Sequence, residues 1–345
     1  MRTLGQAWRE LLEWHLRPTP SIRWFDRWEP AIEEALRALP ELEHCPPELM
    51  REVYETSSYR KRIALVQDGR GPLAVVPLKH VDRRWRPITT WILPATLFPA
   101  RPGEAFTALA TLPMPVHVEW WRQPVPPPSH AGIRYRRDTS THRIACIEED
   151  EAHWRRSGLL NKVRRSRKRC AGLQVEINRP GAARWAIENW GRLWATGAHD
   201  CIPHAAALIA MSRFWEPRGR HLTVALMDGD RFAAAATLFI LGRDLVGMCN
   251  YRDRDYDPLL IGTRLFDAVH QWALANGMAS IDFGHGHRYM KDWAPQSGSI
   301  SEITVRAPRP FPSRLVHAAA RSLAKMTAGV QSAASRTGET DATSS

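Results

Sequence analysis

The chain has 345 residues, of which 44% are hydrophobic and 24% charged, and its formal net charge is +12. This length is too great for one ordinary core and suits two domains of ~150 residues each, with a composition typical of globular proteins. No apolar run approaches the ~18 residues of a transmembrane helix, and residues 1–17 lack the apolar stretch of a signal peptide. We therefore expect a cytoplasmic protein without membrane insertion.

The first half of the chain is predicted to begin with helices and to continue with strands. Residues 1–56 are predicted to be helical, because apolar side chains recur at helical spacing over residues 23–39 and Pro40 ends that run. A β-hairpin is predicted for residues 62–67 and 73–81. Further strands are expected at residues 89–93, 116–120 and 133–147, with a short helix at 102–109 and a proline-rich connection at 123–130.

A basic helix is predicted for residues 151–172, with Gly172 as its C-terminal cap. Residues 151–180 contain nine Arg or Lys and two Glu, a net charge of +7. The small and apolar residues form one narrow stripe of Leu159, Val163, Ser166 and Cys170. The basic residues repel one another without acidic partners at i+4, which favours a bound polyanion over a merely solvated helix face. We assign this contact to Arg164, Arg165 and Lys168.

The second half of the chain predicts strands and helices in a defined order. From residue 174 onward the order is β-α-α-β-β-β-α-β-α-β. The three central strands are joined by tight turns, and the following amphipathic helix ends at Gly277. The predicted strands are residues 174–178, 221–227, 231–241, 244–251, 279–283 and 301–306, and the longer helices are residues 182–196, 205–215 and 262–276.

The five cysteines are dispersed along the chain, and no pair has the spacing of a metal-binding knuckle. An odd, dispersed set is typical of a reducing compartment. We therefore expect free thiols, no disulfide framework and no structural zinc.

The segment Leu160-Asn161-Lys162-Val163-Arg164-Arg165-Ser166-Arg167, followed by Gly172-Leu173-Gln174-Val175, resembles the start of the acetyltransferase domain in the CelD-like and Fem-like families. Tyr251, Gly262-Thr263-Arg264-Leu265, Gly277 and Asp282-Phe283-Gly284 resemble their second signature. These families belong to the GNAT superfamily. The resemblance covers residues 151–306 well and extends more weakly to the first half.

The resemblance implies an α/β (α+β) fold of two GNAT-like domains, with mixed, mostly antiparallel sheets flanked by helices. Residues 1–150 are expected to form a degenerate N-terminal GNAT-like domain, and residues 151–310 the acyltransferase domain. We expect a C-terminal helix at residues 311–330 and a disordered tail at residues 331–345, which is rich in Ser, Ala, Thr and Gly.

The resemblance also implies acetyl-CoA or another acyl-CoA as donor, with the diphosphate at the start of the helix that follows the three strands. Free backbone N–H groups and the helix dipole favour anions there. We assign donor contacts to Gly262, Thr263, Arg264 and Tyr251. Glycine lets the backbone approach closely, threonine can cap the helix and arginine adds charge.

Catalysis requires the acceptor amine to lose a proton and the leaving thiolate to gain one. We assign these roles to Asp282, His285, Tyr289 and Lys291, while positioning of the reactants alone is the alternative. The sequence departs from the family here, because Met290 separates Tyr289 from Lys291 where CelD-like members have tyrosine followed directly by lysine. No metal is expected, since His285 and His287 lack a third ligand. His199 and Asp200 are predicted to contact the acceptor.

The predicted function is therefore N-acyl transfer from acyl-CoA to an amine of a small molecule or glycan precursor. Two alternatives remain. The first is a Fem-like transferase that takes an aminoacyl group from tRNA, with the basic helix against the RNA backbone. The second is a non-catalytic protein that binds nucleic acid through residues 160–170.

Overall fold

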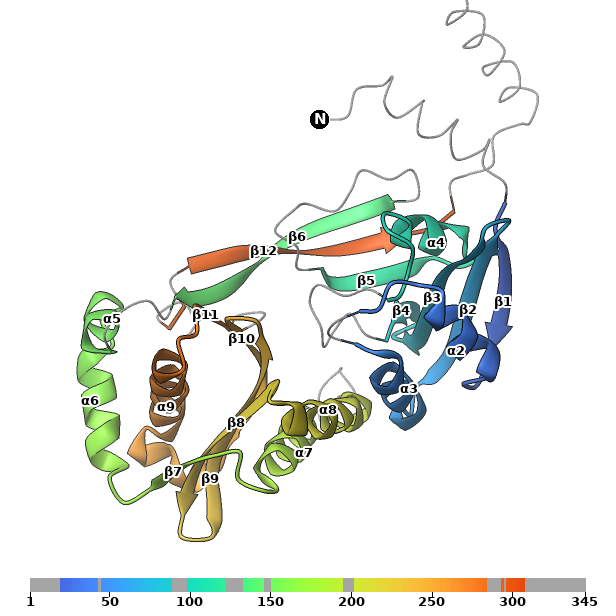
Figure 1. Ribbon diagram of the computed structural model, residues 1–345. Helices are drawn as coiled ribbons and strands as arrows, with labels where there is room; N and C mark the ends of the chain where they lie inside the picture. Colours follow the sequence, from blue (N-terminus) through green and yellow to red (C-terminus); the bar gives the residue numbers. More distant parts are fainter. Residues whose placement is uncertain are drawn as a thin grey trace, which may run out of the picture.

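The computed structural model of the chain describes residues 19–42, 45–88, 98–121, 133–145, 150–194, 202–283, 293–294 and 296–307. Two lobes, each a sheet flanked by helices, are bridged by the long strands β6 (Ile133–Ala145) and β12 (Gln296–Val305) (Figure 1). The expected α/β class, with mixed and mostly antiparallel strands flanked by helices, is confirmed.

The N-terminal lobe contains five strands and three helices among its described residues. They are, in chain order, β1 (Ser21–Phe25), α2 (Pro30–Arg37), α3 (Pro47–Thr56), β2 (Arg60–Asp68), β3 (Gly71–Val81), β4 (Arg84–Pro87), α4 (Ala105–Thr111) and β5 (Val116–Trp121).

After β6, the chain forms the C-terminal lobe, which contains the same kinds of element. They are α5 (Asp150–Arg156), α6 (Leu160–Arg169), β7 (Gln174–Ile177), α7 (Ala182–Trp194), α8 (Ile202–Trp215), η1 (Glu216–Arg218), β8 (His221–Asp228), β9 (Arg231–Leu241), β10 (Asp244–Arg252), η2 (Arg254–Leu259), α9 (Ile261–Ala275) and β11 (Ser280–Asp282).

The two lobes repeat one topology. In the N-terminal lobe β1 to β4 pair antiparallel in sequence order, and β4 then pairs parallel with β5. In the C-terminal lobe β7 to β10 do the same, and β10 pairs parallel with β11. In each lobe two helices follow the first strand and one helix precedes the last strand.

The lobes exchange their closing strands. β6, which follows the first repeat, pairs with β11 of the second repeat and with β12. β12, which follows the second repeat, pairs with β5 of the first. The described strands therefore join into one 12-stranded ladder in the order β1-β2-β3-β4-β5-β12-β6-β11-β10-β9-β8-β7.

The prediction of helix at the start of residues 23–39 is wrong. Residues Ser21–Phe25 form β1, in which Trp24 pairs with Ala64 and Phe25 with Ile63 of β2. The helix begins only at Pro30, whose fixed φ suits the first helical position. Glu29 is extended, with φ −134° and ψ 155°, as expected for a residue before proline. Strand pairing and Pro30 therefore override the helical spacing.

The single helix predicted for residues 151–172 is two helices, and the predicted cap at Gly172 is wrong. Gly158 lies between α5 and α6 with φ +71°, a left-handed conformation that ends α5. α6 ends at Arg169, and Cys170 is its C-cap. The predicted stripe is confirmed, since Leu159, Val163, Ser166 and Cys170 are all buried.

Most other predicted elements are confirmed with small changes in their ends. The hairpin at residues 62–67 and 73–81 corresponds to β2 and β3, and residues 262–276 correspond to α9, which Gly277 follows with φ +66°. β6 is one long strand. The predictions for residues 1–18, 89–93, 123–130, 311–330 and 331–345 lie outside the described residues.

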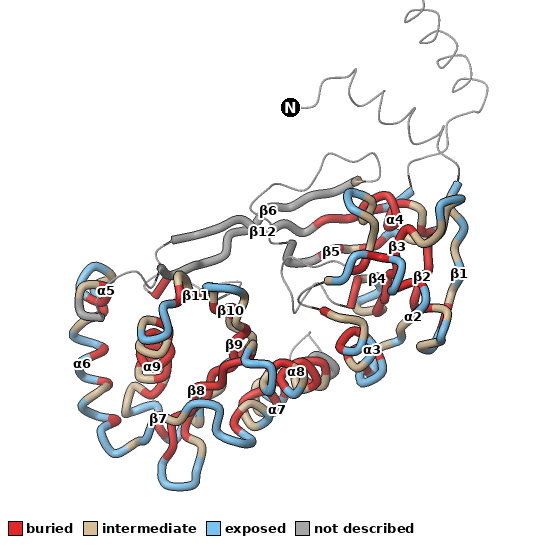
Figure 2. The backbone as a smooth tube through the Cα atoms, viewed as in Figure 1, coloured by how far each residue is buried: buried red, intermediate tan, exposed pale blue. Residues whose placement is uncertain are grey.

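Helices cover both faces of the C-terminal sheet. On one face, Leu222, Val224 and Leu226 of β8 pack against Leu265 and Val269 of α9. On the other face, alanines of β8 and β9 pack against Ala182 and Ala186 of α7, and these small side chains let the helix approach closely. Figure 2 shows α9 largely buried and α6, outside it, largely exposed.

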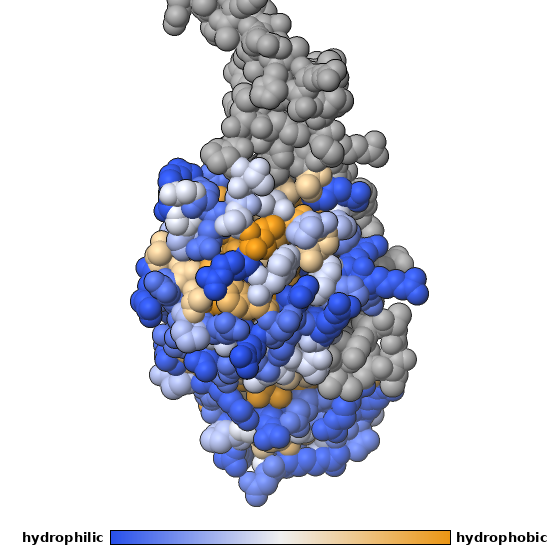
Figure 3. Space-filling view, turned by 90° about the vertical axis from the view of Figure 1, so that its right-hand side faces the viewer, coloured by the Kyte–Doolittle hydropathy of each residue, from blue (hydrophilic) through white to orange (hydrophobic). Residues whose placement is uncertain are grey.

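One hydrophobic cluster joins the two lobes. Leu49 and Val53 of α3 belong to the same buried cluster as Leu208 and Met211 of α8, so α8 packs between its own sheet and the N-terminal lobe. Hydrophilic side chains cover most of the face of the N-terminal lobe seen in Figure 3, with a limited hydrophobic area. The described apolar residues of this lobe therefore lie mainly in its interior.

Candidate functional site

The parallel pairing between β10 and the described part of β11 ends after three residue pairs. Asp244, Leu245 and Val246 pair with Ser280, Ile281 and Asp282, whereas β10 continues to Arg252 alongside β9. The β9 ladder has a bulge at Met248, because Gly247 pairs with Leu238 and Cys249 with Thr237. A bulge bends its strand and increases its twist. We use the term fork for this end of the pairing together with the stretch of β10 that continues from it to Arg252, and the apex of the fork is the pair Val246–Asp282.

A glycine lets the two strands meet closely at this apex. A Cβ atom on Gly247 would lie 3.4 Å from the main-chain oxygen of Asp282 and 3.8 Å from Cα of Phe283. Asp282 is 6% exposed and also pairs with Arg143 of β6. It is the predicted catalytic residue that the structure places at the fork. His285, Tyr289 and Lys291 lie outside the described residues, as do His199 and Asp200.

Tyr251 lies near the far end of β10. It is half-buried, and its ring packs edge-on against Trp185 of α7, with ring centroids 5.2 Å apart. It therefore belongs to the α7 side of the sheet, opposite α9. Tyr251 lies five positions beyond Val246, which is roughly 16 Å along a strand. The predicted donor contact and the predicted catalytic carboxylate thus lie at opposite ends of the fork.

The N-terminus of α9 lies beside the open end of the fork. Its N-cap, Leu260, makes no side-chain capping hydrogen bond, and the first turn contains no acidic residue. The backbone N–H groups of Ile261 and Gly262 precede the first positions that can bond within the helix, so they form the positive end of its dipole. Thr263 is buried, with 7% of its surface exposed.

Arg252, at the end of β10, reaches this helix terminus. A Cβ atom on Gly262 would lie 3.5 Å from Cδ and 3.9 Å from Nε of Arg252. The Nε atom also donates to Oδ1 of Asp257 at 2.6 Å. Sequence reasoning missed Arg252, although a basic residue at the end of the strand that leads to a helix start is a usable signal for an anion site.

Three further hydrogen bonds hold the connection between β10 and α9. The Arg231 guanidinium donates to the carboxylates of Asp253 and Asp255 at 2.6 and 3.0 Å. The Tyr256 hydroxyl donates to Asp228 at 2.9 Å. Burial and this hydrogen bond raise the pKa of Tyr256, so the phenol remains a donor at neutral pH. The connection is thereby tied to the β8–β9 hairpin.

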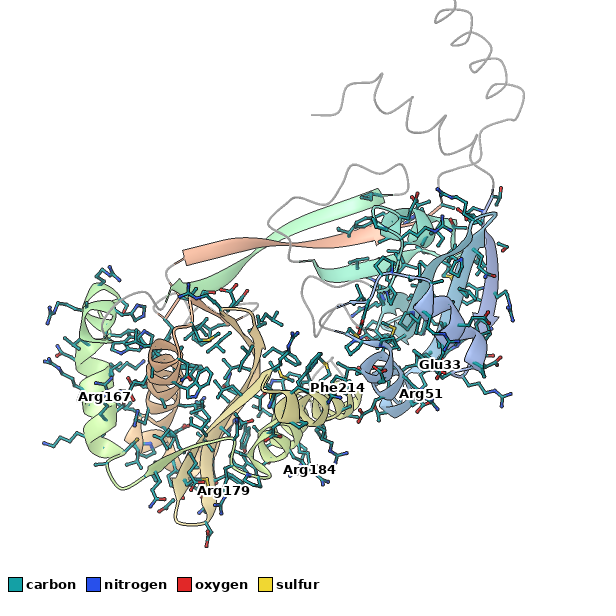
Figure 4. The ribbon with its side chains drawn as sticks, viewed as in Figure 1. Glu33, Arg51, Arg167, Arg179, Arg184 and Phe214 are labelled. Atoms are coloured by element: carbon teal, nitrogen blue, oxygen red, sulfur yellow. The ribbon has the colours of Figure 1, made fainter. Side chains whose placement is uncertain are left out.

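A fully buried carboxylate joins α6 to α9. Asp267 is 0% exposed, and Arg167 of α6 donates to it through Nε at 2.9 Å and Nη2 at 2.6 Å. Arg264 donates to the same carboxylate through Nη1 at 2.8 Å. Figure 4 labels Arg167 on α6. The Asp267 carboxylate thus accepts hydrogen bonds from two guanidinium groups. The contact of Arg264 with a phosphate stays a prediction.

Sequence reasoning missed Asp267 because its partner is 100 residues away. A signal was present, since Asp267 lies among the apolar residues Leu265, Phe266 and Val269 on the buried side of an amphipathic helix. A carboxylate on such a face is rarely buried without a charged partner.

The outward surface of α6 carries the predicted polyanion contacts. Arg164, Arg165 and Lys168 are exposed. The last residues of the helix turn inward instead, because Arg169 donates to the carbonyl of Pro258 at 2.9 Å and the Cys170 thiol to that of Leu259 at 3.3 Å. Burial raises the pKa of the Cys170 thiol.

The described residues contain no group of three or more His, Cys, Asp and Glu that could hold a metal ion. Cys45, Cys170 and Cys249 are free and buried, and burial raises the pKa of Cys249 to about 12. Within the same part of the chain, no helix is long and apolar enough to cross a bilayer.

Residues 155–293 match the family model of the Acetyltransferase (GNAT) domain, which confirms the resemblance drawn from the sequence. This match spans α6, the fork and α9. No curated protein matches the chain in sequence.

Several solved structures are similar to this chain at low sequence identity. One is the C-terminal domain of a candidate lysylphosphatidylglycerol synthetase from Agrobacterium fabrum, with 11% identity and a TM-score of 0.48, covering 79% of this chain and 92% of that one. FemX has 11% identity and a TM-score of 0.43, covering 81% and 96%. A tandem GNAT protein from the clavulanic acid biosynthesis pathway has 12% identity and a TM-score of 0.44, covering 85% and 100%.

Proposed function

Because residues 155–293 match the family model of the Acetyltransferase (GNAT) domain, we propose that the protein transfers an acyl group from acyl-CoA to an amine. Acetyl is the acyl group that we propose, and the amine belongs to a small molecule or a glycan precursor. The observation that carries this proposal is the fork, where the described pairing with β11 ends at Val246–Asp282 and β10 continues to Arg252 beside the uncapped N-terminus of α9.

The diphosphate of the donor fits the start of α9. An anion is favoured there by the helix dipole and by the N–H groups of Ile261 and Gly262. Arg252 supplies a positive side chain above Gly262. Thr263 and Arg264 are the further contacts predicted from the sequence.

The corresponding helix of the N-terminal lobe suits an anion less well. α4 has 7 residues where α9 has 15, and its N-cap is Glu104, whose carboxylate would repel a diphosphate. We therefore assign the donor to the C-terminal lobe.

The extended arm of the donor fits along β10. Beyond Val246, residues 249–252 of β10 no longer pair with the described part of β11, so this strand edge can exchange hydrogen bonds with the amide groups of the arm. The thioester then lies toward the apex at Gly247 and Asp282, and Tyr251 borders the arm from the α7 side.

Acyl transfer forms a C–N bond and breaks a C–S bond, while a proton leaves the amine and one reaches the departing thiolate. We assign proton movement to Asp282 at the apex and, from the sequence alone, to His285, Tyr289 and Lys291. Acceptor binding is assigned from the sequence to His199 and Asp200. The use of a cytoplasmic donor agrees with the predicted cytoplasmic location.

Titration with acetyl-CoA tests this proposal directly. A donor at 100 times its Kd stabilises the folded state by about 2.7 kcal/mol, which a thermal shift detects readily. Release of free thiol from acetyl-CoA, followed over a panel of amines, then identifies the acceptor. No thermal shift at millimolar acetyl-CoA would refute the proposed function.

The outward surface of α6 favours a second candidate function. Three exposed cations and the absence of acidic residues from α6 suit a polyanion such as the backbone of tRNA or another nucleic acid. The expected result is RNA binding that falls steeply with salt and is lost in Arg164→Ala/Arg165→Ala. RNA binding at low salt that is unchanged in this variant would contradict the assignment.

A further inference from the structure

α6 and α9 lie antiparallel, with the end of α6 against the start of α9. Leu159 and Val163 share a hydrophobic cluster with Phe266. One turn further along α6, Arg167 binds Asp267, and beyond it Arg169 and Cys170 bind the carbonyls of Pro258 and Leu259. The last turn of α6 is therefore attached to the segment that immediately precedes the donor-binding helix terminus.

This segment has a backbone conformation that needs support. Leu260 has φ +61° and ψ 39°, which is the left-handed region that leucine rarely adopts. Its N–H donates to the carbonyl of Asp257 at 3.0 Å, and its own carbonyl accepts from Thr263 and Arg264. An unusual conformation of this kind persists only where surrounding contacts over-determine it, and it marks functional sites more often than others.

We propose that Arg167 and Asp267 are positioning residues for the donor site. Their ion pair fixes α6 along α9, so that Arg169 and Cys170 hold residues 258–260 in the conformation that presents the N–H groups of Ile261 and Gly262. Arg167 and Asp267 act through this segment and do not touch the donor. This inference rests on the proposed function, because it concerns how that donor site is held.

The charges of this contact fit a positioning role better than a merely structural one. Asp267 is fully buried and accepts both donors of Arg167 in a bidentate geometry, which fixes direction as well as distance. Packing between the helices does not depend on this pair, since Leu159, Val163, Trp154, Phe266 and Trp293 form a separate buried cluster. Removing the ion pair should therefore shift the register of the helices while leaving them packed.

The test compares two donors in two variants and one control. Arg167→Gln and Asp267→Asn each break the pair, and Lys162→Gln removes one exposed positive charge from the same helix without touching α9. The donors are acetyl-CoA and acetyl-pantetheine, which has the thioester arm but no diphosphate. Thermal unfolding is measured for every protein, so that loss of folding is recognised.

We expect KM for acetyl-CoA to rise about 10- to 100-fold in Arg167→Gln and in Asp267→Asn, while kcat changes by less than about threefold. The kcat/KM for acetyl-pantetheine should stay unchanged, because that donor does not use the helix terminus. Lys162→Gln should behave like the wild-type protein. The double variant should be no worse than Asp267→Asn alone, because that variant already breaks the contact with Arg167.

Three results would overturn the inference: an unchanged KM for acetyl-CoA in folded Arg167→Gln, equal losses for both donors, or additive losses in the double variant. If Asp267→Asn does not fold, Arg167→Gln still decides, since it leaves Arg264 bound to Asp267. Failure of the wild-type protein to bind acetyl-CoA would refute the proposed function instead, and the two failures are therefore distinguishable.

Discussion

His221 should make the stability of the protein fall in mild acid. It is the first residue of β8 and is 1% exposed, beside the ring of Phe239 at a centroid distance of 6.2 Å. Among the described residues, neither ring nitrogen has a hydrogen-bond partner. Burial lowers the pKa of His221 from 6.5 to about 4. The neutral ring is therefore the form that the folded protein accepts.

The sign follows from the two protonation states. Between pH 6.5 and pH 4 the unfolded chain binds a proton at this position and the folded protein does not. The contribution of the neutral His221 to the free energy of unfolding is therefore fully present above pH 6.5. It is lost progressively as the pH is lowered toward 4. The difference in pKa, at 1.36 kcal/mol per unit, corresponds to about 3 kcal/mol in total.

Urea denaturation at pH 7.5, 6.0, 5.0 and 4.5 would measure this loss, with His221→Leu as the comparison. The variant lacks the titrating group and leaves no polar ring nitrogen buried, so we expect it to be more stable than the wild-type protein at pH 5 by about 2 kcal/mol. His117, whose pKa is lowered to about 4 by burial and by nearby arginines, titrates in both proteins and cancels in the difference. An equal loss of stability with pH in both proteins would contradict the reasoning.

Three further predictions concern the fork, the helix terminus and the break before α6. Arg252→Gln should weaken acetyl-CoA binding about tenfold by calorimetry, as expected for the loss of a charge-assisted hydrogen bond. Lys162→Gln, which removes an exposed charge from α6, should not weaken it. Gly247→Val should lower the free energy of unfolding by about 1–3 kcal/mol in urea denaturation, because the valine side chain meets the main chain of Asp282. It should also abolish thiol release, and an active variant would argue against the fork. Gly158→Ala should cost about 1 kcal/mol because of its φ of +71°, and Gly172→Ala, at a glycine without a positive φ, should cost less.

The topological repeat explains how a second lobe stabilises the site. β6 pairs with β11, whose three residues form one arm of the fork. A strand this short would have little support as an edge. The exchange of β6 and β12 places it inside the sheet, so the fork is held by residues from both halves of the chain.

Local patterns were sufficient for the elements whose stabilising contacts are near in sequence. The hairpins of β8, β9 and β10 were predictable because alternating apolar residues are joined by tight turns, and each strand pairs with its neighbour along the chain. The stripe of Leu159, Val163, Ser166 and Cys170 was equally readable, since helical spacing alone places these residues on one side.

The tertiary structure decided whatever depends on contacts between distant residues. Pairing with β2 makes residues 21–25 a strand despite the helical spacing of residues 23–39. The ion pair of Arg167 with Asp267 and the approach of Arg252 to Gly262 come from the docking of α6 and β10 beside α9, which no local spacing encodes. From the sequence alone, then, came the family, the order of the described elements from residue 174 onward and the start of α9 to within one residue. The arrangement of charges around that helix start required the fold, because electrostatic partners are chosen by distance in space and not by distance along the chain.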